Sequence, residues 1–249
     1  MKATFRLLLL VVLAALALQF YFVARIALMA IVDPESTAFE RSEVWQVAQK
    51  TGELKWRQQW VPYAALPLTL KRAVIASEDA SFIEHEGVDV EALEKAWEKN
   101  TRAEQRVTQA ASKLDAARPA GQPAKPAKIV GGSTITQQLA KNLLLSGERT
   151  LLRKGQELVL TLLLEAFLNK QRILEIYLNN VEWGEGIFGA EAAAQHYYRK
   201  PAARLSAYEA ARLAVMLPQP KYFETRSNSG YLSSRASTIA ARMAGVEVP

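Results

Sequence analysis

A long apolar stretch near the N-terminus is the feature that most constrains this chain. Residues 7–24 carry no charge, Gln19 is their only strongly polar member, and the apolar character resumes after Arg25. At 1.5 Å per residue, a helix of this length is long enough to cross a hydrocarbon core of roughly 30 Å. The stretch predicts one membrane-spanning helix over residues 7–32, which follows a short tail of residues 1–6.

The charges around this stretch predict its orientation. Lys2 and Arg6 precede it, whereas Asp33 and Glu35 follow it. The positive-inside rule therefore places the N-terminus in the cytoplasm and the rest of the chain outside. Two alternatives remain open: a cleavable signal peptide, which shares the basic start but usually has a shorter apolar core, and a buried core helix.

Composition limits the chemistry of the remaining chain. With 249 residues, half of them apolar, one compact catalytic domain with an appendage is expected rather than two full domains. The absence of cysteine excludes disulfides and a cysteine nucleophile, and two histidines argue against a histidine-rich zinc site. The net charge of +6 indicates anionic partners: nucleic acid, an acidic membrane surface or a phosphorylated substrate. An extracytoplasmic position argues against nucleic acid.

The exported part is organised as a linker followed by a mainly α-helical domain. Residues 33–68 read as a segment that docks the anchor onto the domain, residues 69–249. No alternating run is long enough for a large sheet. Residues 101–128, rich in Ala, Lys and Pro, are expected to form a mobile insertion. Asp89 and Ser206 are predicted N-caps. Helices are predicted over residues 42–51, 69–84, 89–100, 134–145, 153–168, 171–179, 190–198 and 207–217.

The first segment with candidate catalytic side chains is residues 78–87, with the sequence EDASFIEHEG. It places carboxylates and a histidine directly after an apolar helix. Charged groups beside an apolar core cost free energy unless they are paired, so their presence there calls for an explanation. Taken alone, Glu78 is better explained as a solvated carboxylate at a helix end, and His85 as a structural hydrogen-bonding group.

The second segment is residues 131–142, GGSTITQQLAKN, in which a glycine pair and hydroxyls precede a helix. Such a helix start offers backbone N–H groups to a phosphate. Gln137, Gln138 and Lys141 follow one turn later, at spacings that keep them on neighbouring faces. For the glycine pair alone, an ordinary capped helix is the favoured interpretation.

The third segment combines cations with a carboxylate at the head of an apolar helix. Arg153 and Lys154 lie four and three residues before Glu157, and Arg149 precedes them. An exposed ion pair here would contribute little to stability, but in a cleft the same group could bind pyrophosphate. Two carboxylates with an array of cations suit the transfer of a sugar from a phosphate leaving group.

Together the three segments resemble the peptidoglycan glycosyltransferase family, found in bifunctional penicillin-binding proteins and in short monofunctional transglycosylases. Residues 78–87 match its E-D-x-x-F-x-x-H-x-G motif, and residues 131–142 match G-G-S-T-I-T-Q-Q-x-x-K-N. Residues 149–157 match R-T-x-x-R-K-x-x-E, and residues 173–179 match I-L-E-x-Y-L-N. With no Ser-x-x-Lys transpeptidase domain, the chain resembles the monofunctional branch.

The resemblance implies a lysozyme-like, mainly α-helical fold with a small membrane-facing lobe. It implies that Glu78 is the catalytic base and that Glu157 is the second acidic residue. The substrate-binding residues it implies are Ser133, Thr134, Gln137, Gln138, Lys141, Arg149, Arg153 and Lys154. The motif residues it implies in support are Asp79, Phe82, His85, Gly87 and Asn142.

The activity implied is polymerisation of glycan strands from lipid II, with inversion at the anomeric carbon, during cell wall biogenesis. The domain would lie in the periplasm, anchored in the inner membrane. No cofactor or dedicated metal site is implied, although Mg²⁺ or another divalent cation assists at the pyrophosphate in some members. Expected partners are lipid II, the nascent strand, membrane lipids, and cell-division or penicillin-binding proteins. The alternatives are a lytic muramidase, which has no use for pyrophosphate-binding cations, and a non-catalytic scaffold.

Overall fold

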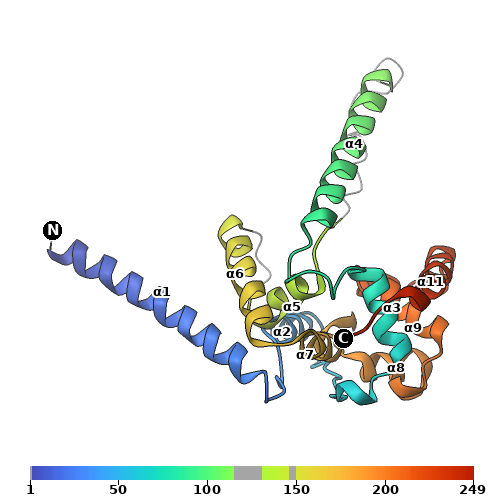
Figure 1. Cartoon of the computed structure of the whole chain (residues 1–249), viewed down its shortest axis with the longest axis horizontal. Helices are drawn as coiled ribbons and strands as arrows, with labels where there is room; N and C mark the ends of the chain where they lie inside the picture. Colours follow the sequence, from blue (N-terminus) through green and yellow to red (C-terminus); the bar gives the residue numbers. More distant parts are fainter. Residues whose placement is uncertain (1, 115–130, 146–149) are drawn as a thin grey trace.

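The protein consists mainly of helices, as predicted. The computed structural model describes residues 2–114, 131–145 and 150–249. Helix α1 (Lys2–Leu28) and helix α4 (Val90–Leu114) project from the body in different directions (Figure 1).

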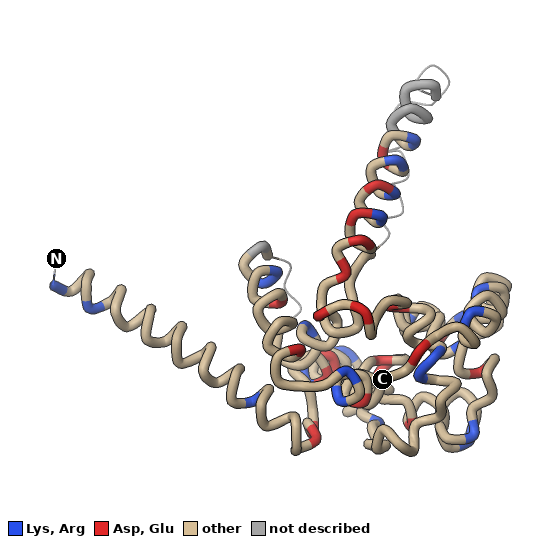
Figure 2. The backbone as a smooth tube through the Cα atoms, in the orientation of Figure 1, with Lys and Arg blue, Asp and Glu red and all other residues tan. Residues whose placement is uncertain are grey.

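Helix α1 is long and apolar enough to cross a membrane, which is compatible with a single-pass anchor. Its Lys and Arg residues lie only toward its two ends (Figure 2). The second half of α1 approaches helix α6 (Leu151–Phe167), and its side chains Phe22 and Ile26 are buried against the body. The first half is exposed along its whole length.

Arg172 holds the chain where it leaves α1. Its Nε donates to the carbonyl of Met29 at 2.8 Å, and Nη2 donates to the carbonyl of Val32 at 3.1 Å. The same guanidinium forms ion pairs of 2.7 Å with Asp33 and with Glu175. Charge-assisted bonds of this kind are the stronger ones in proteins, so the exit of α1 is firmly attached to the body.

The predicted docking segment is anchored by a buried polar network. Thr37 and Glu40 form a capping box at the start of α2 (Ala38–Thr51). The second oxygen of Glu40 accepts from Gln58 at 3.2 Å, and Gln58 also donates to the carbonyl of Asn179 at 3.0 Å. Buried polar groups need such partners, and here they connect the linker to the core.

The core of the domain is built from packed helices. Helix α3 packs against α9 and α11, and α5 packs against α6 and α7. Two short strands, β1 and β2, form an antiparallel hairpin. The bounds are α3 Leu68–Glu78, α5 Ile135–Leu144, α7 Lys170–Asn180, β1 Glu182–Gly184, β2 Ile187–Phe188, α8 Ala190–Tyr198, α9 Ala207–Met216, α10 Pro220–Glu224 and α11 Gly230–Arg242, with short 3-10 turns at Tyr63–Ala65, Ala202–Arg204 and Met243–Gly245.

The helix predicted over residues 69–84 is too long, because α3 ends at Glu78. Asp79 leaves the helix with an extended φ of −161°, and its carboxylate accepts a hydrogen bond from the backbone N–H of Ile135 at 2.9 Å. Because the Asp79 side chain bonds the first turn of α5, residue 79 does not continue α3.

The helix predicted over residues 89–100 is too short, because α4 continues to Leu114. Ion pairs one turn apart follow its exposed surface, between Lys95 and Glu91 at 2.5 Å and between Arg102 and Glu98 at 3.1 Å. Such pairs and a composition rich in Ala, Glu and Lys favour a helix without packing. The predicted mobile insertion therefore begins as a helix, and its remainder lies outside the described residues.

Candidate active site

Glu78 is the last residue of α3 and faces the start of α5. Its Oε2 accepts a hydrogen bond from Gln138 Nε2 at 3.0 Å, and Tyr177 donates to the Gln138 Oε1 at 2.9 Å. Burial keeps the pKa of Tyr177 well above its usual range, so this hydroxyl is a donor and fixes the orientation of the amide. The Gln138 amide therefore presents a donor, not an acceptor, to Glu78.

The carboxyl of Glu78 has the properties of a general base. Burial raises its pKa, and the hydrogen bonds from Gln138 and Ser77, together with the charge of Arg235, oppose this shift only partly. A carboxylate whose pKa is moved toward neutral pH is a better proton acceptor than an ordinary surface carboxylate.

The other residues of the first motif hold the loop that follows Glu78. His85 Nε2 lies 2.9 Å from Asp79 Oδ1, and the N–H of Gly87 donates to His85 Nδ1 at 3.1 Å. A neutral His85 with this bonding carries its proton on Nε2 and donates to Asp79. Phe82 is fully buried, and Gly87 has a positive φ of 86°. These contacts hold the loop that follows Glu78 in place.

The second motif forms an ordinary capped helix start. Thr134 and Gln137 form a capping box on α5, and the Thr134 hydroxyl donates to the carbonyl of Gly87 at 2.6 Å. The first-turn N–H groups of Ile135 and Gln137 therefore have partners within the protein. The interpretation of this helix start as an open phosphate cradle is wrong for these two groups. Asn142 is buried on the same helix.

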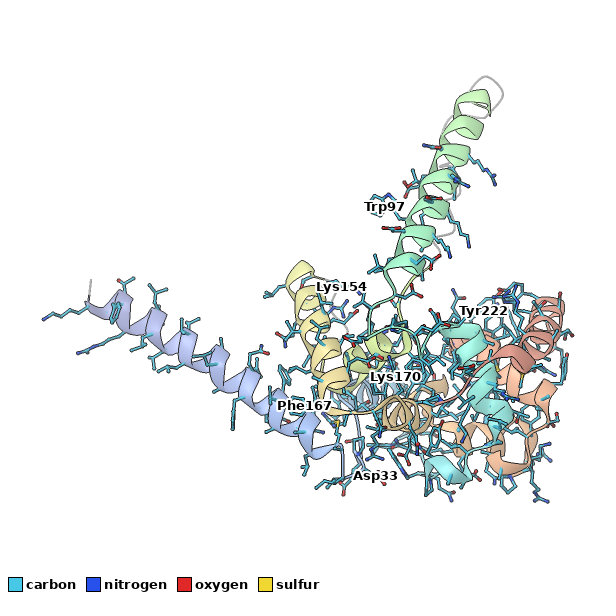
Figure 3. All side chains as sticks on the ribbon, in the orientation of Figure 1. Asp33, Trp97, Lys154, Phe167, Lys170 and Tyr222 are labelled. Carbon is cyan, nitrogen blue, oxygen red and sulfur yellow. The ribbon has the colours of Figure 1, made fainter. Side chains whose placement is uncertain are left out.

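The third motif places a buried carboxylate between two cations. Glu157 is only 4% exposed and forms ion pairs with Arg153 Nη1 at 3.1 Å and with Lys154 Nζ. The Nε of Arg153 is buried and has no hydrogen-bond partner within the described part of the chain. A buried donor without a partner costs free energy. Lys154 extends from α6 in Figure 3, and Arg149 lies outside the described residues.

Two cavities meet at Glu78. The first, of about 530 Å³, contains both carboxylates. The second, of about 690 Å³, lies along the loop after α3 and the base of α4 and shares Ser77, Glu78, Gly131 and Ser133 with the first. The predicted site residues that line the first cavity are Glu78, Ser133, Gln137, Gln138, Lys141, Arg153, Lys154 and Glu157.

One group of metal-binding residue types lies close together within the described ranges. The ligand atoms of Asp79, His85 and Asp89 are within 4.8 Å of one another. However, Asp79 accepts from two donors, and Asp89 accepts from Ser81 and from the N–H of Ala92. Each carboxylate thus accepts two hydrogen bonds within the protein, so the cluster forms part of the network that holds the loop after α3.

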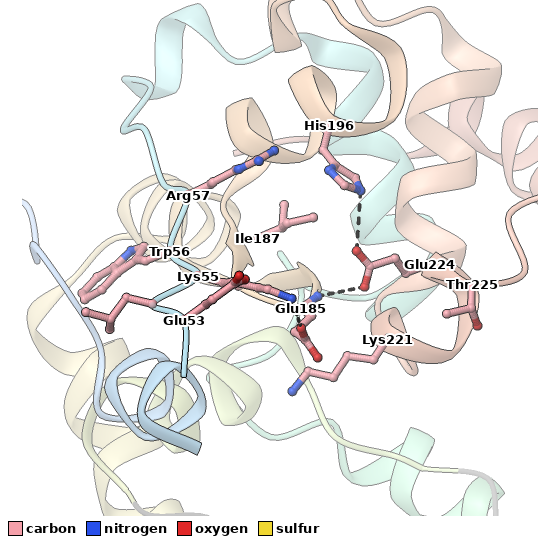
Figure 4. Close-up of a pocket in the computed structure, with 12 residues that line it drawn as sticks. Glu53, Lys55, Trp56, Arg57, Glu185, Ile187, His196, Lys221, Glu224 and Thr225 are labelled. Carbon is pink, nitrogen blue, oxygen red and sulfur yellow. Dashed lines mark hydrogen bonds and ion pairs between the residues drawn. The ribbon is translucent and has the colours of Figure 1, made fainter. Parts of the chain in front are cut away.

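A third cavity, of about 610 Å³, lies where residues 53–57 meet the hairpin and α10 (Figure 4). Two ion pairs lie in its wall, Lys55 with Glu185 at 2.9 Å and His196 with Glu224 at 3.5 Å. None of the predicted site residues lines it. The pair of Lys55 and Glu185 joins the linker to the hairpin, whereas the pair of His196 and Glu224 joins α8 to α10.

Sequence reasoning missed three groups around Glu78: Ser77, Tyr177 and Arg235. Tyr177 lies in the matched I-L-E-x-Y-L-N block, which was a signal, but its role became visible only from its contact with Gln138. Arg235 lies on α11, for which no helix was predicted, and no signal marked it.

Comparison with known proteins identifies the family of the chain. The model of the family described as transglycosylase matches residues 46–116 and 115–244. A protein of Burkholderia thailandensis is 52% identical over 236 residues, which cover 95% of this chain and 84% of the relative. Relatives in Burkholderia pseudomallei and Burkholderia orbicola are 51% and 49% identical over 95% of this chain, covering 84% and 87% of their own lengths. All three are named biosynthetic peptidoglycan transglycosylase. By this match and by these relatives, the chain belongs to the transglycosylase family.

Proposed function

We infer that this chain is a peptidoglycan glycosyltransferase that polymerises glycan strands for the cell wall. The observation that carries the mechanism is the difference between the two carboxylates of the 530 Å³ cavity. Glu78 is bonded to a neutral amide and has a raised pKa, whereas Glu157 lies between two cations. Glu78 is therefore suited to accept a proton, and the Glu157 cluster is suited to bind a negatively charged group.

The proposed reaction uses the lipid-linked disaccharide lipid II as acceptor. Glu78 takes the proton of the 4-hydroxyl of its N-acetylglucosamine, and the oxygen attacks C1 of the N-acetylmuramic acid at the end of the growing strand. The bond between C1 and the undecaprenyl pyrophosphate breaks with inversion at C1, and the electron pair leaves with the pyrophosphate.

The cations of the third motif are proposed to stabilise the departing pyrophosphate. Arg153 offers its unpaired Nε, and Lys154 and Lys141 line the same cavity. Donors already in place where negative charge develops are a large source of rate acceleration. Glu157 is proposed to orient the two cations with which it is paired. The mechanism requires no cofactor and routes no step through a divalent cation.

The proposed location follows from the anchor and its flanking charges. Helix α1 is proposed to cross the bacterial inner membrane with Lys2 and Arg6 in the cytoplasm, so that the catalytic domain lies in the periplasm beside its lipid-linked substrate. Membrane lipids, the nascent strand and proteins of cell division or cross-linking are the proposed partners.

The test is to incubate the detergent-solubilised protein with labelled lipid II and to separate the products on a gel. A ladder of long strands that muramidase digests is expected, and Glu78→Gln is expected to remove it without changing the melting temperature. Glu94→Gln, an exposed carboxylate on α4, is the control and should keep the activity. Shortening of added glycan strands would instead support the lytic alternative. The absence of both activities would support the scaffold alternative.

A further inference from the structure

Two glutamines join the anchor to the catalytic helix α6. Gln19 Nε2 donates to Gln156 Oε1 at 2.9 Å, and Gln156 Nε2 donates to Gln19 Oε1 at 3.2 Å. This reciprocal amide pair connects positions 137 residues apart in the chain. Gln19 is also the only strongly polar side chain in the uncharged stretch of residues 7–24.

The surroundings of the pair are apolar on both helices. On α1, Gln19 begins a face that continues with Phe22 and Ile26, which are buried against the body. On α6, Leu152 and Val159 lie one turn before and one turn after Gln156, and both are exposed, Leu152 to 87%. Apolar side chains exposed beside a membrane-spanning helix are stable in lipid and unfavourable in water.

The position of Gln19 along α1 places the pair within the apolar layer. Gln19 lies five residues before the end of the uncharged stretch, which is about 8 Å along a helix. A polar side chain at this depth has no water to bind and must find its partner in the protein. The amide pair satisfies a donor and an acceptor on each side chain.

Gln156 directly precedes Glu157, and the two side chains point to different sides of α6. Gln156 contacts α1, whereas Glu157 and its cations line the cavity of the active site. The depth at which Gln156 is held therefore sets the depth of the cation cluster. We propose that Gln19 is a positioning residue whose amide pair with Gln156 holds the Arg153, Lys154 and Glu157 cluster at a depth from which its long cationic side chains reach the substrate's phosphates in the outer leaflet. This proposal rests on the proposed function.

The first experiment measures depth and does not depend on catalysis. Because the chain has no cysteine, Leu152→Cys gives a single labelling site one turn from Gln156. A fluorophore on this cysteine is quenched by lipids that carry spin labels near the headgroup or deep in the acyl chain, in vesicles of phosphatidylethanolamine and phosphatidylglycerol. Gln19→Leu is expected to shift the quenching toward the shallow label.

The second experiment separates positioning from stability. In the same vesicles, Gln19→Leu is expected to raise KM for lipid II about five-fold with unchanged kcat, which corresponds to ~1 kcal/mol for an interhelical amide pair. In detergent micelles, where no bilayer fixes the depth, its KM should equal that of the wild type. Gln156→Leu should behave in the same way, and the double variant should be no worse than either single one.

Gln46→Leu, the same change at an exposed position of α2, is the control and should alter neither depth nor KM. Unchanged quenching in both glutamine variants would overturn the proposal, as would an equal rise of KM in micelles and vesicles. If the wild type makes no polymer, the proposed function fails, but the quenching result still decides whether the pair sets the depth.

Discussion

The hydrogen bond from Gln138 to Glu78 gives a measurable prediction about pH. Gln138→Leu keeps a side chain of similar size but removes the donor that stabilises the ionised carboxylate at 3.0 Å. Hydrogen bonds to charged groups contribute about 1.5–3 kcal/mol, and one pKa unit corresponds to about 1.4 kcal/mol. At the low end of this range, for a site open to a cavity, the loss of this bond raises the pKa of Glu78 further.

A base must be ionised to act, so the acid limb of kcat/KM should move about one pH unit upward in Gln138→Leu. At pH values below the limb the activity falls about ten-fold, and at high pH it stays within a few-fold of the wild type. Polymerisation of labelled lipid II from pH 5 to 9 measures the limb. Ser77→Ala removes a longer bond of 3.4 Å and should move it less. A lower plateau with an unmoved limb would refute the reasoning, because Gln138 would then act only in binding.

Three further predictions concern stability and the cation cluster. Burial raises the pKa of Glu40 to about 7, so its stabilising contribution is complete below the unfolded pKa of about 4.3 and is lost as the pH rises through 7. The free energy of unfolding of the wild type should therefore fall between pH 5 and 8. In Glu40→Gln this fall should be smaller by up to about 3 kcal/mol, measured by urea unfolding. Gly189 has a φ of 80°, and an added Cβ would lie 2.5 Å from the Asn179 carbonyl oxygen, so Gly189→Ala should cost more than about 2 kcal/mol and lower the melting temperature. Lys154→Gln should lower kcat/KM about ten-fold while leaving the melting temperature within a few degrees, and equal kinetics would exclude contact of Lys154 with the pyrophosphate.

Local patterns predicted most of the helices because their start and stop signals are local. Ser206 and Glu209 form the predicted capping box, the N–H of Ala92 donates to the predicted cap Asp89, and the helix predicted over residues 190–198 has the observed bounds. The three motifs likewise identified both carboxylates of the cavity, although the individual roles of those residues stay predictions.

Contacts between distant segments explain what was missed. The orientation of Gln138 depends on Tyr177, 39 residues away, and no periodicity in the sequence carries that information. The end of α3 at Glu78 depends on the contact of Asp79 with α5, which forms only when the two motifs come together. The N–H of Ile135 at the start of α5 is occupied for the same reason, since it donates to Asp79, 56 residues away in the chain.

Arg172 attaches the anchor helix α1 rigidly to the catalytic body. Its bonds to the carbonyls of Met29 and Val32 and its ion pair with Asp33 join the end of α1 to the catalytic body, so the two cannot rotate freely about a hinge. A spanning helix of fixed length adjusts to the thickness of its bilayer by tilting. Because the body is fastened to α1, tilting of α1 in the proposed membrane-spanning position would turn the active-site opening relative to the membrane plane, and bilayer thickness would become part of the geometry in which the enzyme meets its substrate.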